Sequence, residues 1–417
     1  MNHLFLFFYT IALSLVFLFY QKRKKIFDSA SLMFVMYISG AIFSLTTYQN
    51  QTGASSFFFP LIYLFSALLI IFTPFMKFNS TKTPLVLPNR FLINLLSWIF
   101  VVSSFLGIFL SPTSVVEELQ GVLFNELYGL ELYNNMLDSV EGSGQNIQNL
   151  PMIIMNAMYT FAALLLFVNL TYEKRNKLLI GLICFCLFYG AIKYISIGER
   201  GGLVNRSLIV LVSYVCMKDY LSEKINKRVR KVGLIVGVIL AIPFMALTAS
   251  RFSDTDEGTK NSLYNYAGQG TIYFCQYGLD DNGIRYGDRT VSLFKRTIGI
   301  PNTPRNFIER RSKYPHLKIN DEVFSTIVGD FAIDFGPFIA FLIFISISLI
   351  LTQIVDKSRD RINFHYFILL HLCMCAIVQG VSLFQYSDAG NLTIVFYLLL
   401  FFYLRIVKGV YLPTKTY

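Results

Sequence analysis

Charge is scarce in this chain of 417 residues: Asp, Glu, Lys and Arg make up 15% of it, whereas about 25% is usual in a soluble domain. Hydrophobic residues make up 54%, which is more than one core of a chain of this length can bury. Together these values exclude a soluble globular protein. The apolar residues instead form runs of about 20, the length that a helix needs to cross a bilayer. The sequence therefore predicts a polytopic membrane protein.

Residues that hold metals or form disulfides are also few. The chain has four histidines and six cysteines, and no histidine stands at ligand spacing from either Cys-x-Cys pair, so we expect no zinc site and no cofactor. Cys275 is the one cysteine outside the apolar runs, which excludes a disulfide framework on the oxidising side. Internal repeats and soluble domains are absent as well, which favours a single integral membrane domain over residues 1–417.

A cleavable signal peptide is missing too. The first apolar run, His3–Tyr20, has no basic segment before it and no small-residue cleavage site after it. Because Lys22–Lys25 follow it directly, it is predicted to be an uncleaved anchor whose N-terminus lies outside. Helix is the only conformation that satisfies the backbone of such runs in lipid. The eleven predicted spans are 3–20, 29–47, 56–75, 91–110, 151–171, 178–197, 203–217, 232–249, 336–355, 362–384 and 390–406.

Basic residues are unevenly distributed between the two sides of these spans. Short cytoplasmic loops collect Lys and Arg. We therefore expect the N-terminus in the periplasm, the C-terminus in the cytoplasm and the protein in a bacterial inner membrane. The same distribution accounts for the net charge of +11 without a nucleic-acid partner. The predicted cytoplasmic segments, which hold 22 of the 36 Lys and Arg residues against six acids, are 21–28, 76–90, 172–177, 218–231, 356–361 and 405–417.

Two segments expected on the outer side are too long to be turns. Residues 111–150 carry six acids and no Lys or Arg, as expected of a translocated loop. Residues 251–335, which lead into the ninth span, contain many aromatic and basic residues. Long loops in a compact protein are usually functional or disordered. Because this loop is rich in aromatics, we expect it to be ordered and to contain the active site.

A cluster of cations is expected at the outer boundary, around the turn Gly198-Glu199-Arg200-Gly201-Gly202-Leu203. Lys193 lies a helical turn below this turn on one side, and Arg206 a turn below it on the other. Guanidinium groups offer paired donors for phosphate oxygens, and adjacent glycines let a bulky anion approach the backbone. We therefore expect an anion site. The alternative is that Glu199 pairs with Arg200 while Lys193 extends to the interface.

Two more arginines are candidates for the same anion site. Arg251 follows the eighth span at the outer boundary, and Arg289 stands in Gly287-Asp288-Arg289 within the long loop. For Arg251 the alternative is an interface anchor, and for Arg289 it is a solvated loop charge.

Three residues are candidates for acid–base chemistry. Asp330 and Asp334 are four residues apart before the ninth span, on one face if the segment is helical. A carboxylate among Phe side chains has a raised pKa and can act as a general base or acid. The alternative is that Asp334 caps the ninth helix, ahead of Phe-Gly-Pro. His316, in the outer loop, is a further possible proton acceptor.

Two motifs together resemble those of the bacterial oligosaccharide repeat-unit polymerases, the O-antigen polymerases of the Wzy type. They are Gly198-Glu199-Arg200-Gly201-Gly202-Leu203 after an outward-ending span, and FSTIVGDFAIDFG, residues 324–336, before a late span. The loop sequences YNYAGQGTIYFCQYGLD and YGDRTVSLFKRTIGIPNTPRNF also look like the family's periplasmic segment. The resemblance in residues covers the chain from about 190 to 340.

The resemblance implies a GT-C-like, metal-independent and inverting glycosyltransferase. It would transfer a growing glycan from undecaprenyl pyrophosphate to a newly flipped lipid-linked repeat unit at the periplasmic face. Its partners would be these lipid-linked glycans, membrane lipid and a chain-length regulator protein, and the loop aromatics would stack on sugars. The pyrophosphate would be bound by Arg200, Arg251, Lys193, Arg206 and Arg289, and the base would be Asp334, Asp330 or His316.

Two other functions stay open. The Arg-Gly-x-Leu pattern also looks like that of the O-antigen ligases, which move finished chains to lipid A, although their loop histidine motif has no clear match here. A lipid-linked oligosaccharide flippase would also be polytopic and cationic. Transporters favour repeated halves and polar sites near the midplane. This chain lacks repeats and has its charge at one boundary, which favours an enzyme.

Overall fold

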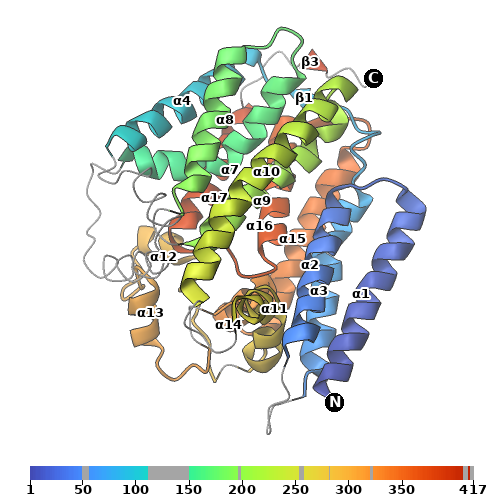
Figure 1. Ribbon diagram of the computed structural model, residues 1–417, viewed down its shortest axis with the longest axis vertical. Coiled ribbons are helices and arrows are strands. Elements are labelled where there is room, and N and C mark those ends of the chain that lie inside the picture. Colours follow the sequence, from blue (N-terminus) through green and yellow to red (C-terminus); the bar gives the residue numbers. More distant parts are fainter. Residues whose placement is uncertain are drawn as a thin grey trace. The chain divides into compact units, whose positions relative to one another are not determined.

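Figure 1 shows the computed structural model, which describes residues 1–48, 56–110, 150–195, 199–252, 258–280, 282–319, 323–406 and 412–413. Helices dominate these ranges. The predicted outer loop at 111–150 lies outside the described residues except for Leu150, where a helix begins.

Each of the eleven predicted spans overlaps a helix, although α8 ends at Ile192 and α16 at Gln379, before the predicted ends at 197 and 384. Eight helical stretches in the described ranges are long and apolar enough to cross a membrane, and α8 and α16 are apolar but shorter. The prediction of an all-α, polytopic membrane protein is confirmed at this level. The helices are α1 (Asn2–Lys24), α2 (Ser29–Thr47), α3 (Phe58–Lys77), α4 (Arg90–Phe109), α7 (Leu150–Thr171), α8 (Lys177–Ile192), α9 (Arg200–Met217), α10 (Glu223–Phe252), α15 (Pro337–Lys357), α16 (Phe364–Gln379) and α17 (Asn391–Ile406).

The long loop before the ninth span contains more helix than the sequence predicted. It forms α11 (Gly258–Tyr277), α12 (Ser292–Thr297), α13 (Phe307–Lys313) and α14 (Thr326–Phe335). Asp330 and Asp334 both lie in α14, so the segment is helical, which was the condition for the two to share a face.

The chain divides into two compact units. Unit 1 contains Met1–Asn79, Leu263–Arg359 and Leu369–Val395. Unit 2 contains Ser80–Ser262, Asp360–Ile368 and Phe396–Tyr417.

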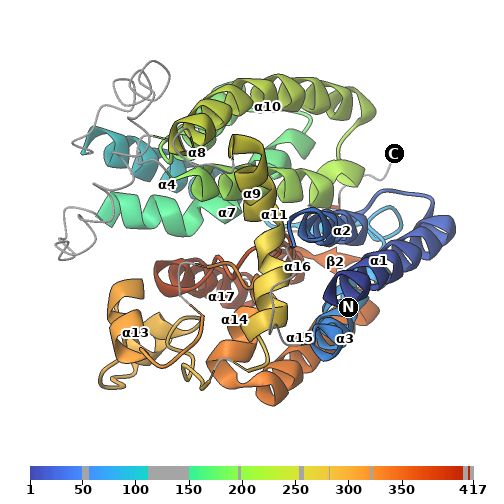
Figure 2. The same ribbon diagram turned by 60° about the horizontal axis from the view of Figure 1, so that its bottom comes forward.

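In unit 1, α1, α2, α3 and α15 lie side by side (Figure 1). At the end of this bundle where α3 and α15 begin, the Tyr63 hydroxyl donates to the Pro337 carbonyl at 2.6 Å. At the same end α11 packs on α2, since the Ser44 hydroxyl donates to the Gly268 carbonyl at 2.7 Å. Figure 2 turns this end forward and shows α14 next to α15.

The opposite end of unit 1 is rich in cations. Lys24 donates to the Phe78 carbonyl at 3.2 Å, and Lys77 lies 3.9 Å from Asp356. The ends of α1, α3 and α15 therefore meet there. The segment 263–335 and Lys22–Lys25 lie at opposite ends of the same bundle.

In unit 2, α4, α7, α8 and α9 pack together. Asn169 on α7 donates to the Ser97 hydroxyl on α4 at 3.0 Å within this core. A small sheet has the order β2-β1-β3. Its central strand β1 (Leu85–Leu87) pairs parallel with β2 (Ile362–Asn363) and antiparallel with β3 (Leu412–Pro413).

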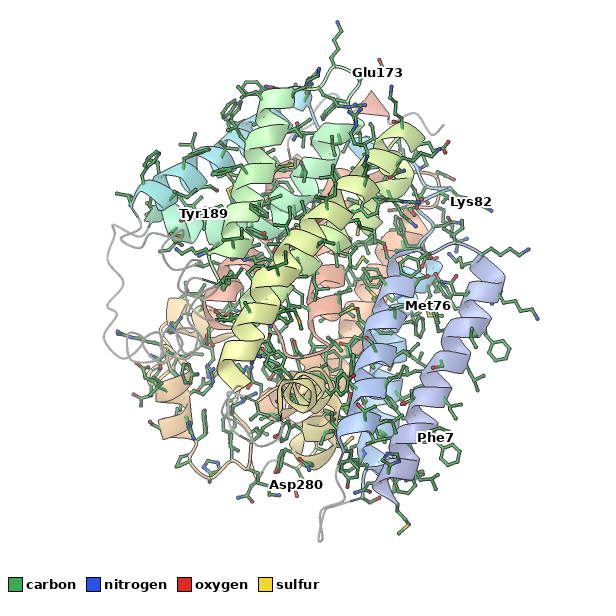
Figure 3. All side chains as sticks on the ribbon, in the orientation of Figure 1. Phe7, Met76, Lys82, Glu173, Tyr189 and Asp280 are labelled. Carbon is green, nitrogen blue, oxygen red and sulfur yellow. The ribbon has the colours of Figure 1, made fainter. Side chains whose placement is uncertain are left out.

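Large apolar side chains are exposed along the outer faces of α1 and α10. Phe7, 47% exposed, points away from α1 in Figure 3, and Leu234 on α10 is 71% exposed. Lipid is the solvent in which such faces are stable.

Candidate functional site

A buried group of charged side chains lies at the α14 end of unit 1. Arg285 is 1% exposed, and Asp330 and Asp334 are fully buried. The Arg285 Nε atom lies 2.7 Å from Oδ1 of Asp334, and Arg285 Nη2 lies 3.8 Å from Oδ1 of Asp330. One guanidinium is therefore held between two carboxylates that one face of α14 presents.

Asp334 also organises the backbone of the preceding turn. Its Oδ2 accepts hydrogen bonds from the Arg289 N–H at 3.3 Å and the Thr290 N–H at 2.7 Å. The residue that caps α15 is Gly336, with φ of 81°, and Pro337 is the first residue of that helix. The sequence left open that Asp334 caps the ninth span, and this alternative is wrong.

Asp330 connects three segments of unit 1. Its Oδ1 lies 3.1 Å from Arg289 Nη1 and accepts from the Ser325 hydroxyl at 3.2 Å. Its Oδ2 accepts from the Phe384 N–H at 2.6 Å. Burial raises the pKa of Asp330 above its usual range, and the neighbouring Arg289 and Arg285 oppose that shift.

A third buried carboxylate, Asp288, contacts two lysines and a tyrosine. Its oxygens contact the ammonium groups of Lys295 and, at 2.6 Å, Lys313. The Tyr314 hydroxyl donates to Oδ2 at 2.8 Å. Burial alone would raise the pKa of Asp288, but the hydrogen bonds from Lys295, Lys313 and Tyr314 outweigh it, and the pKa lies below its usual range.

Arg285 and Tyr314 also line a cavity of about 330 Å³ in unit 1. Two of its lining arginines, Arg285 and Arg310, are buried, and Arg311 and Lys318 are exposed at its edge. Lys318 pairs with Asp280 at 3.1 Å, and Asp280 lies at the periphery of the ribbon in Figure 3. Four cations and a phenol form a site that suits an anion with several oxygens. The lining residues are Arg285, Arg310, Arg311, Tyr314, Pro315, Leu317, Lys318 and Ile319.

The predicted residues of unit 1 lie around this cavity rather than in its lining. Arg289 is buried against Asp330, and both predicted carboxylates hold Arg285. His316 is exposed, between the lining residues Pro315 and Leu317.

Sequence reasoning missed Arg285 and Arg310, the two buried arginines of the lining. A usable signal was the excess of arginine in a loop followed by two carboxylates at helical spacing. Such carboxylates, once buried, require cationic partners.

The aromatic residues of the long loop mostly pack on the protein itself. Tyr264 stacks on Phe43, and Tyr266 packs edge-on against Phe324. Among the loop aromatics predicted to contact sugars, Tyr286 is the exception. It is 67% exposed, next to Arg285 in the sequence.

The predicted cationic turn lies in unit 2. Arg206 donates to the Asn156 side chain at 2.9 Å and to the Tyr194 hydroxyl at 3.2 Å. Its guanidinium lies 3.9 Å from the centre of the Tyr159 ring. Lys193 Nζ lies 3.4 Å from the Met152 sulfur, and Arg206 is near enough to Lys193 to repel it. These two predicted cations therefore lie together.

The other residues of the predicted cationic site, Arg200, Gly202 and Arg251, differ in how they are packed. Arg200 is 5% exposed in the first turn of α9. A Cβ atom on Gly202 would lie 2.0 Å from the Tyr194 ring. This glycine therefore makes room for the Tyr194 ring. Arg251 is the second-last residue of α10, and its side chain lies outside the described part of the chain, as does Gly198.

Metal ligands do not converge in the described ranges: no three His, Cys, Asp or Glu side chains there could hold an ion together. The comparisons with known proteins give no identity, since no family model, no curated protein and no solved structure matches this chain.

Proposed function

We propose that this protein is a polymerase that joins undecaprenyl-pyrophosphate-linked oligosaccharide repeat units at the periplasmic face of a bacterial inner membrane. The observation that carries the proposal is the cationic cavity of unit 1, at the end of the bundle opposite Lys22–Lys25. Because basic residues collect on the cytoplasmic side, that cavity faces the periplasm. This orientation belongs to a chain of eleven spans with a GT-C-like arrangement, an N-terminus outside and a C-terminus inside.

The cavity suits the diphosphate of a lipid-linked donor. Negative charge grows on this leaving group as the glycosidic bond breaks, and donors fixed before the reaction stabilise such charge most effectively. Arg285 is fixed by Asp334 and Asp330, and Arg310 is buried beside it in the lining. Arg311 and Lys318 at the edge attract the substrate to the cavity.

The acceptor sugar needs a base that can reach its hydroxyl. Asp330 and Asp334 are fully buried and hold Arg285, so we assign them a positioning role. His316 is exposed between two lining residues and is our candidate for the base. Inversion at the sugar carbon follows from direct attack by the activated hydroxyl, without a metal.

The cations of unit 2 are our candidates for a second lipid-linked diphosphate. The reaction uses two such lipids, one as donor and one as acceptor. Lys193 and Arg206 lie together, and we group Arg200 and Arg251 with them on the sequence argument. A chain-length regulator protein remains a proposed partner.

The test is the surface glycan of cells that lack this protein. We expect single repeat units on the surface lipid in place of a ladder of lengths. Accumulation of lipid-linked units on the cytoplasmic leaflet would instead indicate a flippase. Full-length polymer that stays on its carrier would indicate a ligase.

The cavity itself is tested in a reconstituted reaction with purified lipid-linked repeat units. We expect the double variant Arg311→Gln, Lys318→Gln to lose at least about tenfold in kcat/KM for the donor, since two charges at the cavity edge are removed. Lys174→Gln, an exposed cation of unit 2, is the control. Equal rates in the two variants would contradict the assignment of the cavity.

A further inference from the structure

The connection between α16 and α17, residues 380–390, contributes to the site from a distant part of the sequence. Its Phe384 N–H donates to Asp330, and Asp388 accepts from Arg310. The residue that follows, Asn391, accepts from the Leu293 N–H at 3.1 Å and donates to the Thr290 carbonyl at 2.8 Å. The contact from Arg310 to Asp388 ties this connection directly to the cavity lining. The other contacts tie the connection and the start of α17 to Asp330 and to residues 290–293.

Asp388 makes the most specific of these contacts. Both of its carboxylate oxygens accept from Arg310 Nη1, at 2.9 and 3.2 Å. Oδ1 also accepts from the Ser292 hydroxyl at 2.9 Å. Arg310 is 2% exposed and lines the cavity. Arg310 Nη1 also donates to the Asp288 carbonyl at 3.3 Å. Asp388 therefore directs this guanidinium together with that carbonyl.

The backbone conformation of Asp388 is one that its contacts with neighbouring residues must stabilise. Its φ is 47°, in the left-handed region that favours glycine. A residue with a side chain persists there only where its other contacts hold it. If the turn were the only requirement at this position, glycine would serve it better.

We propose that Asp388 is a positioning residue that aims Arg310 at the diphosphate in the cavity. The proposal rests on the function proposed above. It predicts that diphosphate binding requires the Asp388 carboxylate, and that the backbone turn at this position is not sufficient.

The chain offers a matched control in Asp280. This carboxylate also pairs with a cavity-lining cation, Lys318, at 3.1 Å. The side chains of that pair are 83% and 44% exposed. Exposed pairs fix their members weakly, so Asp280→Asn removes a carboxylate of the same kind without releasing a buried cation.

The experiment measures inorganic pyrophosphate binding to the purified full-length protein by calorimetry. We expect Asp388→Asn and Asp388→Gly each to weaken binding at least about tenfold, and Asp280→Asn to change it less than about twofold. Arg310→Gln should weaken binding as much as Asp388→Asn, and the double variant no further, because both act through one guanidinium. If Asp388→Asn fails to accumulate, Asp388→Glu displaces the same charge by one methylene and serves in its place.

The outcomes separate this inference from the proposed function. Wild-type affinity in Asp388→Gly would show that the turn alone matters and would overturn the positioning role. Additive losses in the double variant would overturn it as well. Failure of the folded wild-type protein to bind pyrophosphate would instead contradict the diphosphate assignment of the cavity. In the reconstituted reaction, a positioning role changes the kcat and KM of the active protein, whereas a purely structural role lowers only the fraction of active protein.

Discussion

At the scale of single residues, the site depends on charges that have been removed from water together. Arg285, Asp330 and Asp334 are almost completely buried, and each is tolerable there because opposite charges compensate it, with Arg289 also 3.1 Å from Asp330. Removing the charge of any one of them therefore leaves its partners with less compensating charge.

Asp334→Asn is expected to destabilise the protein by about 3 kcal/mol, because it removes the carboxylate charge that lies 2.7 Å from the Arg285 Nε atom. The midpoint of thermal unfolding in detergent measures this change. Glu223→Gln breaks an exposed pair with Lys227 and should leave the midpoint unchanged. An Asp334→Asn variant as stable as the wild type would show that Asp330 alone suffices for Arg285.

Asp288 predicts a pH dependence of stability. Its pKa in the folded protein lies below the ordinary value of 3.8, so folding favours the ionised form. This stabilisation is present above the unfolded pKa and is lost as the pH falls through the folded pKa. The difference in unfolding midpoint between wild type and Asp288→Asn should therefore be constant from about pH 8 to pH 5 and decrease only below about pH 4. A decrease between neutral pH and about pH 5 would contradict the sign of the shift.

At the scale of helices, the contact between Gly202 and the Tyr194 ring predicts the effect of a single methyl group. Gly202→Ala places a Cβ 2.0 Å from that ring and should destabilise unit 2 by about 1–3 kcal/mol through overpacking. Gly237→Ala in α10, where nothing lies within 4 Å, should be neutral or stabilising by up to about 1 kcal/mol.

A second substitution tests whether the contact with the Tyr194 ring causes the loss of stability. Adding Tyr194→Ala to Gly202→Ala removes the ring and should recover part of the loss in unfolding midpoint. If the double variant is less stable than either single variant, Gly202 has another role, such as the anion approach that the sequence suggested.

The helices were predictable from the sequence to the extent that hydrophobicity determines them. All eleven apolar runs overlap helices, and α1 and α3 match their predicted ranges to within a few residues. The helix α11 was missed because its Gly, Gln and Tyr residues lower its hydropathy. It packs on α2 through Gly268, whose Cβ would lie 2.6 Å from the Phe43 backbone, and such an approach leaves no periodic signal in one sequence.

The candidate site was predictable only in part. The spacing of Asp330 and Asp334 correctly placed both on one helix. Their partners could not be derived, because Arg285 and Phe384 are brought to them by tertiary contacts over about 50 residues. Local sequence rules do not determine such pairings.

At the scale of the whole molecule, the proposed topology of eleven spans would place the two termini on opposite sides of the membrane. A reporter fused after Lys218 should be cytoplasmic, and one fused after Asn302 periplasmic, because the first position belongs to a basic segment. Fusions are read by a phosphatase that is active only outside and a fluorescent protein that is active only inside. A reversed pair of signals would overturn the orientation and, with it, the periplasmic cavity.

The residues that line the cavity and the carboxylates that hold them lie in different segments of the chain, which affects how related proteins can diverge in sequence. The anchors Asp330, Asp334 and Asp388 lie in α14 and in the connection before α17, whereas most lining residues lie between 310 and 319. Segment 310–319 is bound to the anchors mainly through Arg310, and to Asp288 through Lys313 and Tyr314. A related protein can therefore acquire a different lining by changing the remaining positions while its membrane helices keep their sequence. Grafting that short stretch between homologues is the natural way to exchange their substrate preference.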